Sequence, residues 1–296
     1  MKNLKLQVLI LLLISSSVFA TISRNEKNAL LDLYTATNGD NWHTKWDFNK
    51  PVESWYGVTV VNDKIVGLEL IANNLDGFIP SSIQDLKFLV NFNVLKNKLK
   101  GDFPAELFKI PTIKHINISF NMYKGHLPES ISLASSLVSL ELFMNQFSGN
   151  LPNNIGNLVN LEVLSLFNNN FEGSLPLGLY DLKNLKELHL NSNFFDGELD
   201  NNIANLSSLE NLSLFDNKLE GTIPSLEKLT NLKALNLSLN SFVNFSDEAL
   251  VSLDKFKLQM YKNNTKEKVL IGQKNATIIV SNNNIKGNPV SLSIKE

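Results

Sequence analysis

Residues 65–80 read IVGLELIANNLDGFIP, and this stretch decides the fold because its pattern returns along most of the chain. The pattern is L-x-x-L-x-L-x-x-N-x-L-x-G-x-I-P, and further copies begin at residues 89, 113, 137, 161, 185, 209 and 232. The step is 24 residues, except for one step of 23 residues after Pro224. A fixed period of this size predicts a repeat protein whose units bury their apolar faces against one another.

Each position of the repeat has a physical role. Leu68 and Leu70 alternate with other residues at the period of a strand, so both leucines are expected to point inward. The chain must then turn beside the core, where the backbone groups of the turn cannot pair with one another. A buried asparagine carries both donors and an acceptor, so it can bond the turn of its own coil and the neighbouring coil. This position is asparagine in all eight copies: Asn73, Asn97, Asn121, Asn145, Asn169, Asn193, Asn217 and Asn240.

The glycine position is filled in seven copies, and proline follows it in most of them. Glycine tolerates positive φ angles, and proline favours an extended return segment. With these features the repeat resembles the plant-type class of the leucine-rich-repeat family, whose mark is the G-x-I-P segment. The resemblance covers about residues 23–264. It implies an α/β repeat fold, a right-handed solenoid with a concave parallel β-sheet, an N-terminal helical cap and a C-terminal β cap.

Four segments are predicted. Residues 1–20 have a basic start, an apolar run and small residues before Ala20, as in a signal peptide cleaved near Ala20. Residues 21–64 form the N-terminal cap, residues 65–264 contain eight repeats of 23–24 residues plus one degenerate coil over residues 256–263, and residues 265–296 form the β cap. No later apolar run is long enough to span a membrane.

The N-terminal cap has its own signals. Ser23 and Glu26 have the spacing of a capping box that opens a helix, and Asn38-Gly39 ends this helix. Asn62-Asp63 predicts a tight turn into the first repeat strand. The three tryptophans, Trp42, Trp46 and Trp55, are expected to plug the end of the solenoid. Plant members of the family usually carry a cysteine pair in this cap, whereas this chain has no cysteine, as in bacterial-looking relatives.

Composition limits the function. The net charge is −2 and no basic stripe is interleaved with aromatic residues, so nucleic acid is not an expected partner. Without cysteine the chain has no disulfide, thiolate metal site or cysteine nucleophile. About one residue in seven is asparagine, and the repeat accounts for part of that excess.

Three columns of side chains are expected to face outward on the concave side. The first column is Glu69, Asn93, Asn117, Glu141, Ser165, His189, Ser213 and Asn236. The second column is Ile71, Leu95, Ser119, Phe143, Phe167, Asn191, Phe215 and Ser238. The third column is Ala72, Lys96, Phe120, Met144, Asn168, Ser192, Asp216 and Leu239.

Exposed aromatic residues and methionine among polar neighbours predict a binding surface. Phe143 and Phe167 are one repeat apart, which is about 5 Å. An equally good interpretation is that these rings only stack between coils. The candidate partner-binding residues are Phe120, Glu141, Phe143, Met144, Phe167, His189 and Phe215.

Enzymatic and metal-dependent functions are not expected. His115 and His189 share the concave face but lie three repeats apart, about 14 Å, which is too far to ligate one metal ion. Glu162, Glu187 and Glu210 are interspersed with Lys186 and Lys233, which favours a solvated face over a catalytic carboxylate pair. The sequence therefore predicts no catalytic residues, no cofactor and no metal ion.

The predicted function is that of a secreted or cell-surface module, periplasmic in a bacterial host, which binds a protein on its concave face. That partner could carry glycans. Two alternatives remain open at this point. One is an inhibitor of secreted polysaccharide-degrading enzymes, as some plant-type relatives are, and the other is an adhesion or structural surface protein.

Overall fold

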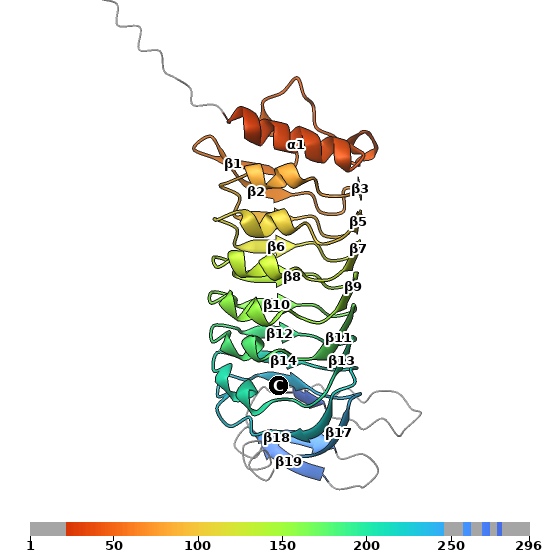
Figure 1. Ribbon diagram of the computed structural model, residues 1–296, viewed down its shortest axis with the longest axis vertical. Coiled ribbons are helices and arrows are strands. Elements are labelled where there is room, and N and C mark those ends of the chain that lie inside the picture. The colour runs from red at the N-terminus through yellow and green to blue at the C-terminus, as the bar shows by residue number, and fades with distance from the viewer. Residues whose placement is uncertain (1–21, 246–256, 262–267, 273–276, 280–296) are drawn as a thin grey trace, which may run out of the picture.

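The computed structural model describes residues 22–245, 257–261, 268–272 and 277–279. The predicted signal peptide and most of the predicted β cap lie outside the described residues. The described chain forms an α/β leucine-rich-repeat solenoid in which one coil stacks on the next, as the repeat predicts (Figure 1). Helix α1 (Arg24–Ala36) covers its N-terminal end.

The concave sheet has ten strands and runs along the described solenoid. It begins with an antiparallel hairpin of β1 (Val58–Val61) and β2 (Lys64–Glu69), and all later neighbours are parallel. Asn62 and Asp63 make the predicted tight turn of that hairpin, both with positive φ. The later strands are β4 (Asn91–Asn93), β6 (His115–Asn117), β8 (Ser139–Glu141), β10 (Val163–Ser165), β12 (Glu187–His189), β14 (Asn211–Ser213), β16 (Ala234–Asn236) and β20 (Thr277–Ile279).

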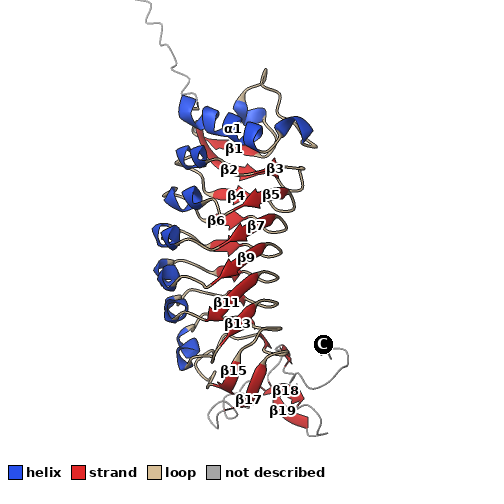
Figure 2. Ribbon diagram, turned by 45° about the vertical axis from the view of Figure 1, so that its right-hand side comes forward, coloured by secondary structure: helices blue, strands red, loops and turns tan. Residues whose placement is uncertain are grey.

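A second parallel sheet forms where each coil leaves the asparagine position (Figure 2). Its strands are β3 (Asp76–Gly77), β5 (Lys98–Gly101), β7 (Met122–Gly125), β9 (Gln146–Gly149), β11 (Asn170–Ser174) and β13 (Phe194–Asp196). A shorter pair, β15 (Glu220–Ile223) and β17 (Ser241–Phe245), follows it and is joined to it by the bridge between Glu198 and Glu220. The seven repeat glycines all have positive φ, as expected.

Short 3₁₀ helices return each coil to the next concave strand, on the side of the molecule opposite the second sheet (Figure 2). In the N-terminal cap they are η1 (Gly39–Asn41) and η2 (Val52–Ser54). In the repeats they are η3 (Ser81–Asp85), η4 (Ala105–Lys109), η5 (Glu129–Leu133), η6 (Asn153–Asn157), η7 (Leu177–Asp181) and η8 (Asn201–Asn205). Proline stands immediately before η3 through η7, and Asp200 caps η8 through its side chain.

The eight repeat asparagines form the predicted ladder. Asn169 is typical: its Nδ2 donates to the carbonyls of Leu166 in its own coil and Leu142 in the preceding coil, both at 3.0 Å. Its Oδ1 accepts a 3.0 Å bond from the backbone N–H of Phe147, also in the preceding coil. The ladder therefore connects each coil to the one before it. At the first rung the N-terminal cap replaces the missing coil, because Asn73 bonds both backbone groups of Thr44.

The N-terminal cap is built as the sequence predicts. Ser23 and Glu26 form a complete capping box on α1. The second carboxylate oxygen of Glu26 accepts a 3.2 Å bond from the backbone N–H of Ile65, which ties α1 to β2. Trp42, Trp46 and Trp55 are all at least 96% buried, and each indole N–H donates to a backbone carbonyl. These tryptophans therefore pack as a plug.

The end of the concave sheet differs from the expectation of a degenerate ninth coil over residues 256–263. Strand β18 (Lys257–Tyr261) pairs antiparallel with β19 (Lys268–Gly272), and it is β20 that pairs parallel with β16. An antiparallel partner can be reached by a short connection, whereas a parallel partner needs a longer crossover. The boundary between repeats and β cap remains a prediction.

A column of stacked aromatic rings fills the core behind the second sheet. Tyr123, Phe147, Phe171 and Phe195 follow one another with ring centroids 6.0–6.1 Å apart. Tyr123 is the odd member, because its hydroxyl is buried without a hydrogen-bond partner. Burial raises the pKa of Tyr123 above its ordinary value, since the charged phenolate would lose its hydration.

We expect Tyr123→Phe to raise the free energy of unfolding by about 1 kcal/mol at pH 7, because it removes an unsatisfied buried polar group. The pKa of Tyr123 is higher in the folded chain than in the unfolded chain. Above about pH 10 the unfolded chain therefore loses the phenolic proton while the folded chain keeps it, and the free energy of unfolding of the wild type falls by up to about 1.4 kcal/mol per pH unit. The variant should lose less stability in that range. Urea unfolding at pH 7 and pH 11 measures both effects, with Tyr56→Phe as the exposed control. A variant less stable than wild type at pH 7 would show that the hydroxyl has a partner.

Candidate functional site

The concave strands bring the first column into one line, as predicted. The sheet register pairs Glu69 with Asn93, and then continues coil by coil to Asn236 without a slip. The leucines on either side of the column, such as Leu140 and Leu142, are fully buried. Side chains of the first column therefore lie next to one another across the whole sheet.

Four apolar side chains gather about halfway along the solenoid, beside the ends of β6, β8 and β10. We call Phe120, Phe143, Met144 and Phe167 the concave aromatic cluster. The rings of Phe143 and Phe167 stack with centroids 4.4 Å apart and an interplanar angle of 9°, close to the predicted spacing. Phe120 meets Phe143 edge to face at 5.5 Å. Phe120 is 45% exposed and Met144 36% exposed, so the cluster presents apolar surface to solvent.

Polar side chains surround this cluster. Glu141 accepts bonds from the amide of Asn117 and the hydroxyl of Ser139, both at 3.2 Å. On the other side the amide of Asn168 donates to the sulfur of Met144 at 3.0 Å. These hydrogen bonds hold the polar rim of the cluster in place, by which we mean Asn117, Ser139, Glu141 and Asn168. Part of the apolar surface of the cluster stays exposed to solvent.

The third column has an unexpected backbone. All eight of its residues have φ between 50° and 59°, although none is glycine. In the left-handed region a side chain carries a steric cost, which needs compensation. The backbone N–H groups of these residues donate to the next coil, for example from Phe120 to Phe143 and from Met144 to Phe167, both at 2.9 Å. This turn carries the chain from the concave sheet to the second sheet and places Phe120 and Met144 at the edge of the concave face.

Some residues expected to face outward are buried instead. Ser119 and Ser238 of the second column are 0% and 1% exposed, and Ser165 of the first column is 4% exposed. These short side chains lie below the level of larger neighbours. Fewer residues of the second column are therefore exposed than predicted. Its phenylalanines, Phe143, Phe167 and Phe215, are partly exposed.

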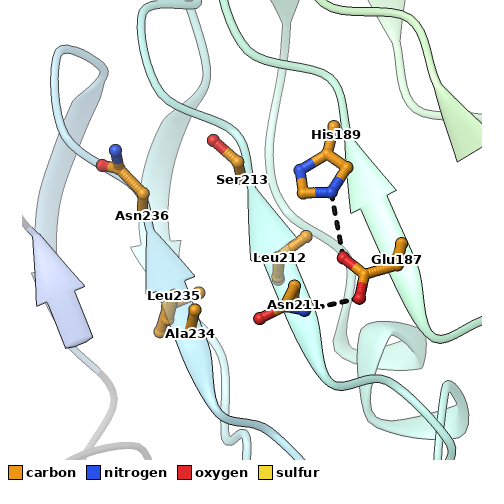
Figure 3. Close-up of a pocket in the computed structure, with 8 residues that line it drawn as sticks. All are labelled: Glu187, His189, Asn211, Leu212, Ser213, Ala234, Leu235 and Asn236. Carbon is orange, nitrogen blue, oxygen red and sulfur yellow. Dashed lines mark hydrogen bonds and ion pairs between the residues drawn. The ribbon is translucent and has the colours of Figure 1, made fainter. Parts of the chain in front are cut away.

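A shallow pocket of about 240 Å³ lies farther along the concave face (Figure 3). Its lining residues are Glu187, His189, Asn211, Leu212, Ser213, Ala234, Leu235 and Asn236. Glu187 is the central polar group, because one of its oxygens lies 3.0 Å from Nε2 of His189 and the other accepts a 2.6 Å bond from Asn211. Two of the lining residues, Ser213 and Ala234, have small side chains, and a run of small residues in the sequence is the signal that could have indicated this hollow.

The predicted partner-binding residues thus fall into two groups. Phe120, Phe143, Met144, Phe167 and Glu141 lie together around β6, β8 and β10. His189 lies in the pocket on β12, and Phe215 follows β14, two coils beyond Phe167. The structure places Phe215 beside no described aromatic ring.

The charged residues at the start of the concave strands pair between coils. Lys186 binds Glu162 with 2.7 Å between nitrogen and oxygen, and Lys233 binds Glu210. The partnership with Glu162 raises the pKa of Lys186. Within the described part of the chain no three His, Cys, Asp or Glu side chains cluster as a metal site would require. Among the same residues, no helix has the length and hydrophobicity needed to cross a membrane.

Comparisons with known proteins agree with this geometry. A family model described as leucine-rich repeat region matches residues 140–268. Residues 140–268 therefore match the leucine-rich-repeat family. No curated protein sequence matches it.

Several solved structures share the solenoid. The ectodomain of the Arabidopsis receptor kinase HAESA, in complex with a peptide hormone, is 34% identical with a TM-score of 0.57, and the match covers 58% of this chain and 29% of that one. The plant peptide hormone receptor RGFR1, in complex with RGF2, is 30% identical with a TM-score of 0.56, over 59% and 28% of the two chains. This leucine-rich-repeat chain spans less than a third of the length of either receptor structure.

A bacterial structure is similar over more of the chain. A leucine-rich-repeat protein of Leptospira interrogans is 27% identical with a TM-score of 0.51, and the match covers 73% of this chain and 55% of that one. Solved structures similar to this chain therefore include leucine-rich-repeat proteins from both a plant and a bacterium.

Proposed function

We propose that this leucine-rich-repeat protein is a secreted or cell-surface module that binds a protein or peptide partner through the concave aromatic cluster. One observation carries the proposal: three phenylalanines and a methionine are presented together on the concave sheet, with part of their apolar surface open to solvent. Phenylalanine, other aromatic residues and methionine are enriched in the cores of protein interfaces.

Three further observations support the proposal. The HAESA ectodomain and the RGFR1 receptor are in complex with a peptide hormone and with RGF2, respectively. The start of the sequence has the features of a signal peptide, which would deliver the mature chain to the outside of the cell. The polar rim of the cluster, including Glu141, supplies the hydrogen bonds that orient a partner.

The cluster is expected to act as a binding hot spot. We expect Phe143→Ala combined with Phe167→Ala to weaken binding of a purified partner by about 30-fold or more, because truncating a hot-spot aromatic costs about 2 kcal/mol. Partners are first captured on the immobilised chain from the culture medium and cell surface of its host, and affinity is then measured by calorimetry with the purified protein. The matched control is Phe78→Ala, an exposed phenylalanine just after the second sheet.

The double variant must retain the wild-type melting temperature to within a few degrees for the comparison to hold. Unchanged affinity in a folded double variant would refute the aromatic cluster as the binding site. Equal loss in Phe78→Ala would show that the effect is not specific to the concave face.

A further inference from the structure

The outward face of the second sheet has a charge pattern that no concave function explains. We define the lateral face as the exposed side chains of β5, β7, β9, β11, β13 and β15 and of the residue that follows each repeat glycine. These side chains alternate with buried core residues, which are the aromatic column in β7 to β13, Leu99 in β5 and Leu219 immediately before β15, so they project away from the core. Figure 2 shows these strands stacked one below another along the side opposite the 3₁₀ helices.

One half of the lateral face is basic and the other half is acidic. Lys100 and Lys124 occupy one position in the coils of β5 and β7, and His126 follows in the next position. Asp196 and Glu220 occupy the same position as the lysines in the coils of β13 and β15, and Glu198 corresponds to His126. All six side chains are exposed. The middle coils carry amides at the preceding position, Gln146 and Asn170.

We propose that the lateral face is a self-association surface through which two copies of this chain bind antiparallel about a two-fold axis between β9 and β11. A two-fold interface places the same patch of both copies together, so every residue meets its counterpart from the mirrored coil. With the axis at this place, Lys124 meets Asp196, Lys100 meets Glu220 and His126 meets Glu198. The partner is therefore a second copy, selected by charge complementarity.

The same two-fold rotation also brings uncharged residues of the two copies into complementary pairs. Met122 is 40% exposed and meets Phe194, which is 44% exposed. Gln146 meets Asn170, so two amides face one another beside the axis and can exchange hydrogen bonds. Moving the axis by half a coil, onto β9, would still pair Lys124 with Glu172 and Lys100 with Asp196, but it would place Asp102 against Glu198 and remove the contact between His126 and Glu198. We therefore place the axis between β9 and β11, and the charge exchange between Lys124 and Asp196 tests this register against the other.

Two local contacts limit the strength of this surface. Lys100 already binds Asp76 in the same chain at 2.9 Å, at an exposed position where an ion pair contributes little. Lys218 would meet Lys98, which is a contact between like charges, and its Nζ lies 4.9 Å from the ring centroid of Phe194 in the same chain. Six coils give a strip about 29 Å long, which belongs to the small, weak class of interfaces. The expected dimer is therefore weak and sensitive to salt.

The test is a charge exchange on the full chain, measured by sedimentation velocity over a concentration series. We expect dimerisation at low salt (about 0.02 M) that weakens at least tenfold at about 0.5 M salt. Lys124→Glu and Asp196→Lys should each weaken dimerisation at least tenfold, because each places like charges together at two symmetric contacts. The double variant Lys124→Glu/Asp196→Lys should regain it, since opposite charges again meet.

Mixing the two single variants gives an independent readout. In the mixed pair both contacts join opposite charges, so heterodimers should form although neither variant dimerises alone. Lys183→Glu makes the same charge change away from the lateral face and is the matched control. A chain that stays monomeric at low salt would overturn the proposal. So would a Lys124→Glu variant that dimerises like wild type, or a double variant that remains as weak as the single ones.

Discussion

Replacing Asn169 with alanine is expected to lower the free energy of unfolding by about 3–5 kcal/mol, because at least three backbone groups lose their buried partners. The groups are the carbonyls of Leu142 and Leu166 and the N–H of Phe147, each now 3.0 Å from the Asn169 side chain. Water cannot replace the lost amide easily, since Asn169 is only 6% exposed. Urea denaturation of the purified chain measures the loss.

The neighbouring residue supplies the control. Asn170 is exposed on β11, and Asn170→Ala should change stability by no more than about 0.5 kcal/mol. Asn169→Asp tests the donor bonds of the side chain separately from its acceptor bond. Aspartate still accepts from the N–H of Phe147, but it turns a carboxylate oxygen toward the carbonyls of Leu142 and Leu166. We expect it to be as destabilising as alanine. Asn169→Ala with near-native stability would mean that the ladder is dispensable at this coil.

Trp46→Ala is expected to cost about 3–5 kcal/mol, as is usual for a large aromatic residue truncated in a core. Trp46 is 4% exposed, stacks on Trp55 at 4.9 Å and meets Trp42 edge to face at 5.0 Å. Its indole N–H also donates to the carbonyl of Tyr56 at 2.8 Å. Because a solenoid without its cap exposes the first coil to water, the loss should spread inward from that end.

Hydrogen exchange distinguishes this cap effect from general destabilisation. In Trp46→Ala the amides of β2 and β4 should lose protection first, while those of β10 and β12 should change least. Phe48→Ala is the comparison, because Phe48 packs at the edge of the same cluster but is 48% exposed, and it should cost about 1 kcal/mol. Uniform loss of protection along the solenoid would refute the plug as a local cap.

Much of the candidate site followed from periodicity alone. The first column was predicted residue by residue, because a strand pair without a register slip puts equivalent repeat positions side by side. The contact between Phe143 and Phe167 followed from the same rule. Burial depth could not be predicted this way. Ser119 is covered because it is shorter than its neighbours, and that depends on side-chain packing between coils.

The amino-acid sequence by itself determined the solenoid, its asparagine ladder, its capping helix and the order of side chains along each column. These features depend on interactions within one repeat or between consecutive repeats, so they can be predicted from the residues that recur with the 24-residue period. Only the tertiary structure decided the left-handed turn at Phe120 and Met144, the pairing of β20 with β16, the pocket around Glu187 and the charge pattern of the lateral face. The pocket and the lateral face depend on how three or more coils sit in space, whereas the turn and the β20–β16 pairing depend on hydrogen bonds between two segments, and none of these is specified by the residue pattern of a single repeat.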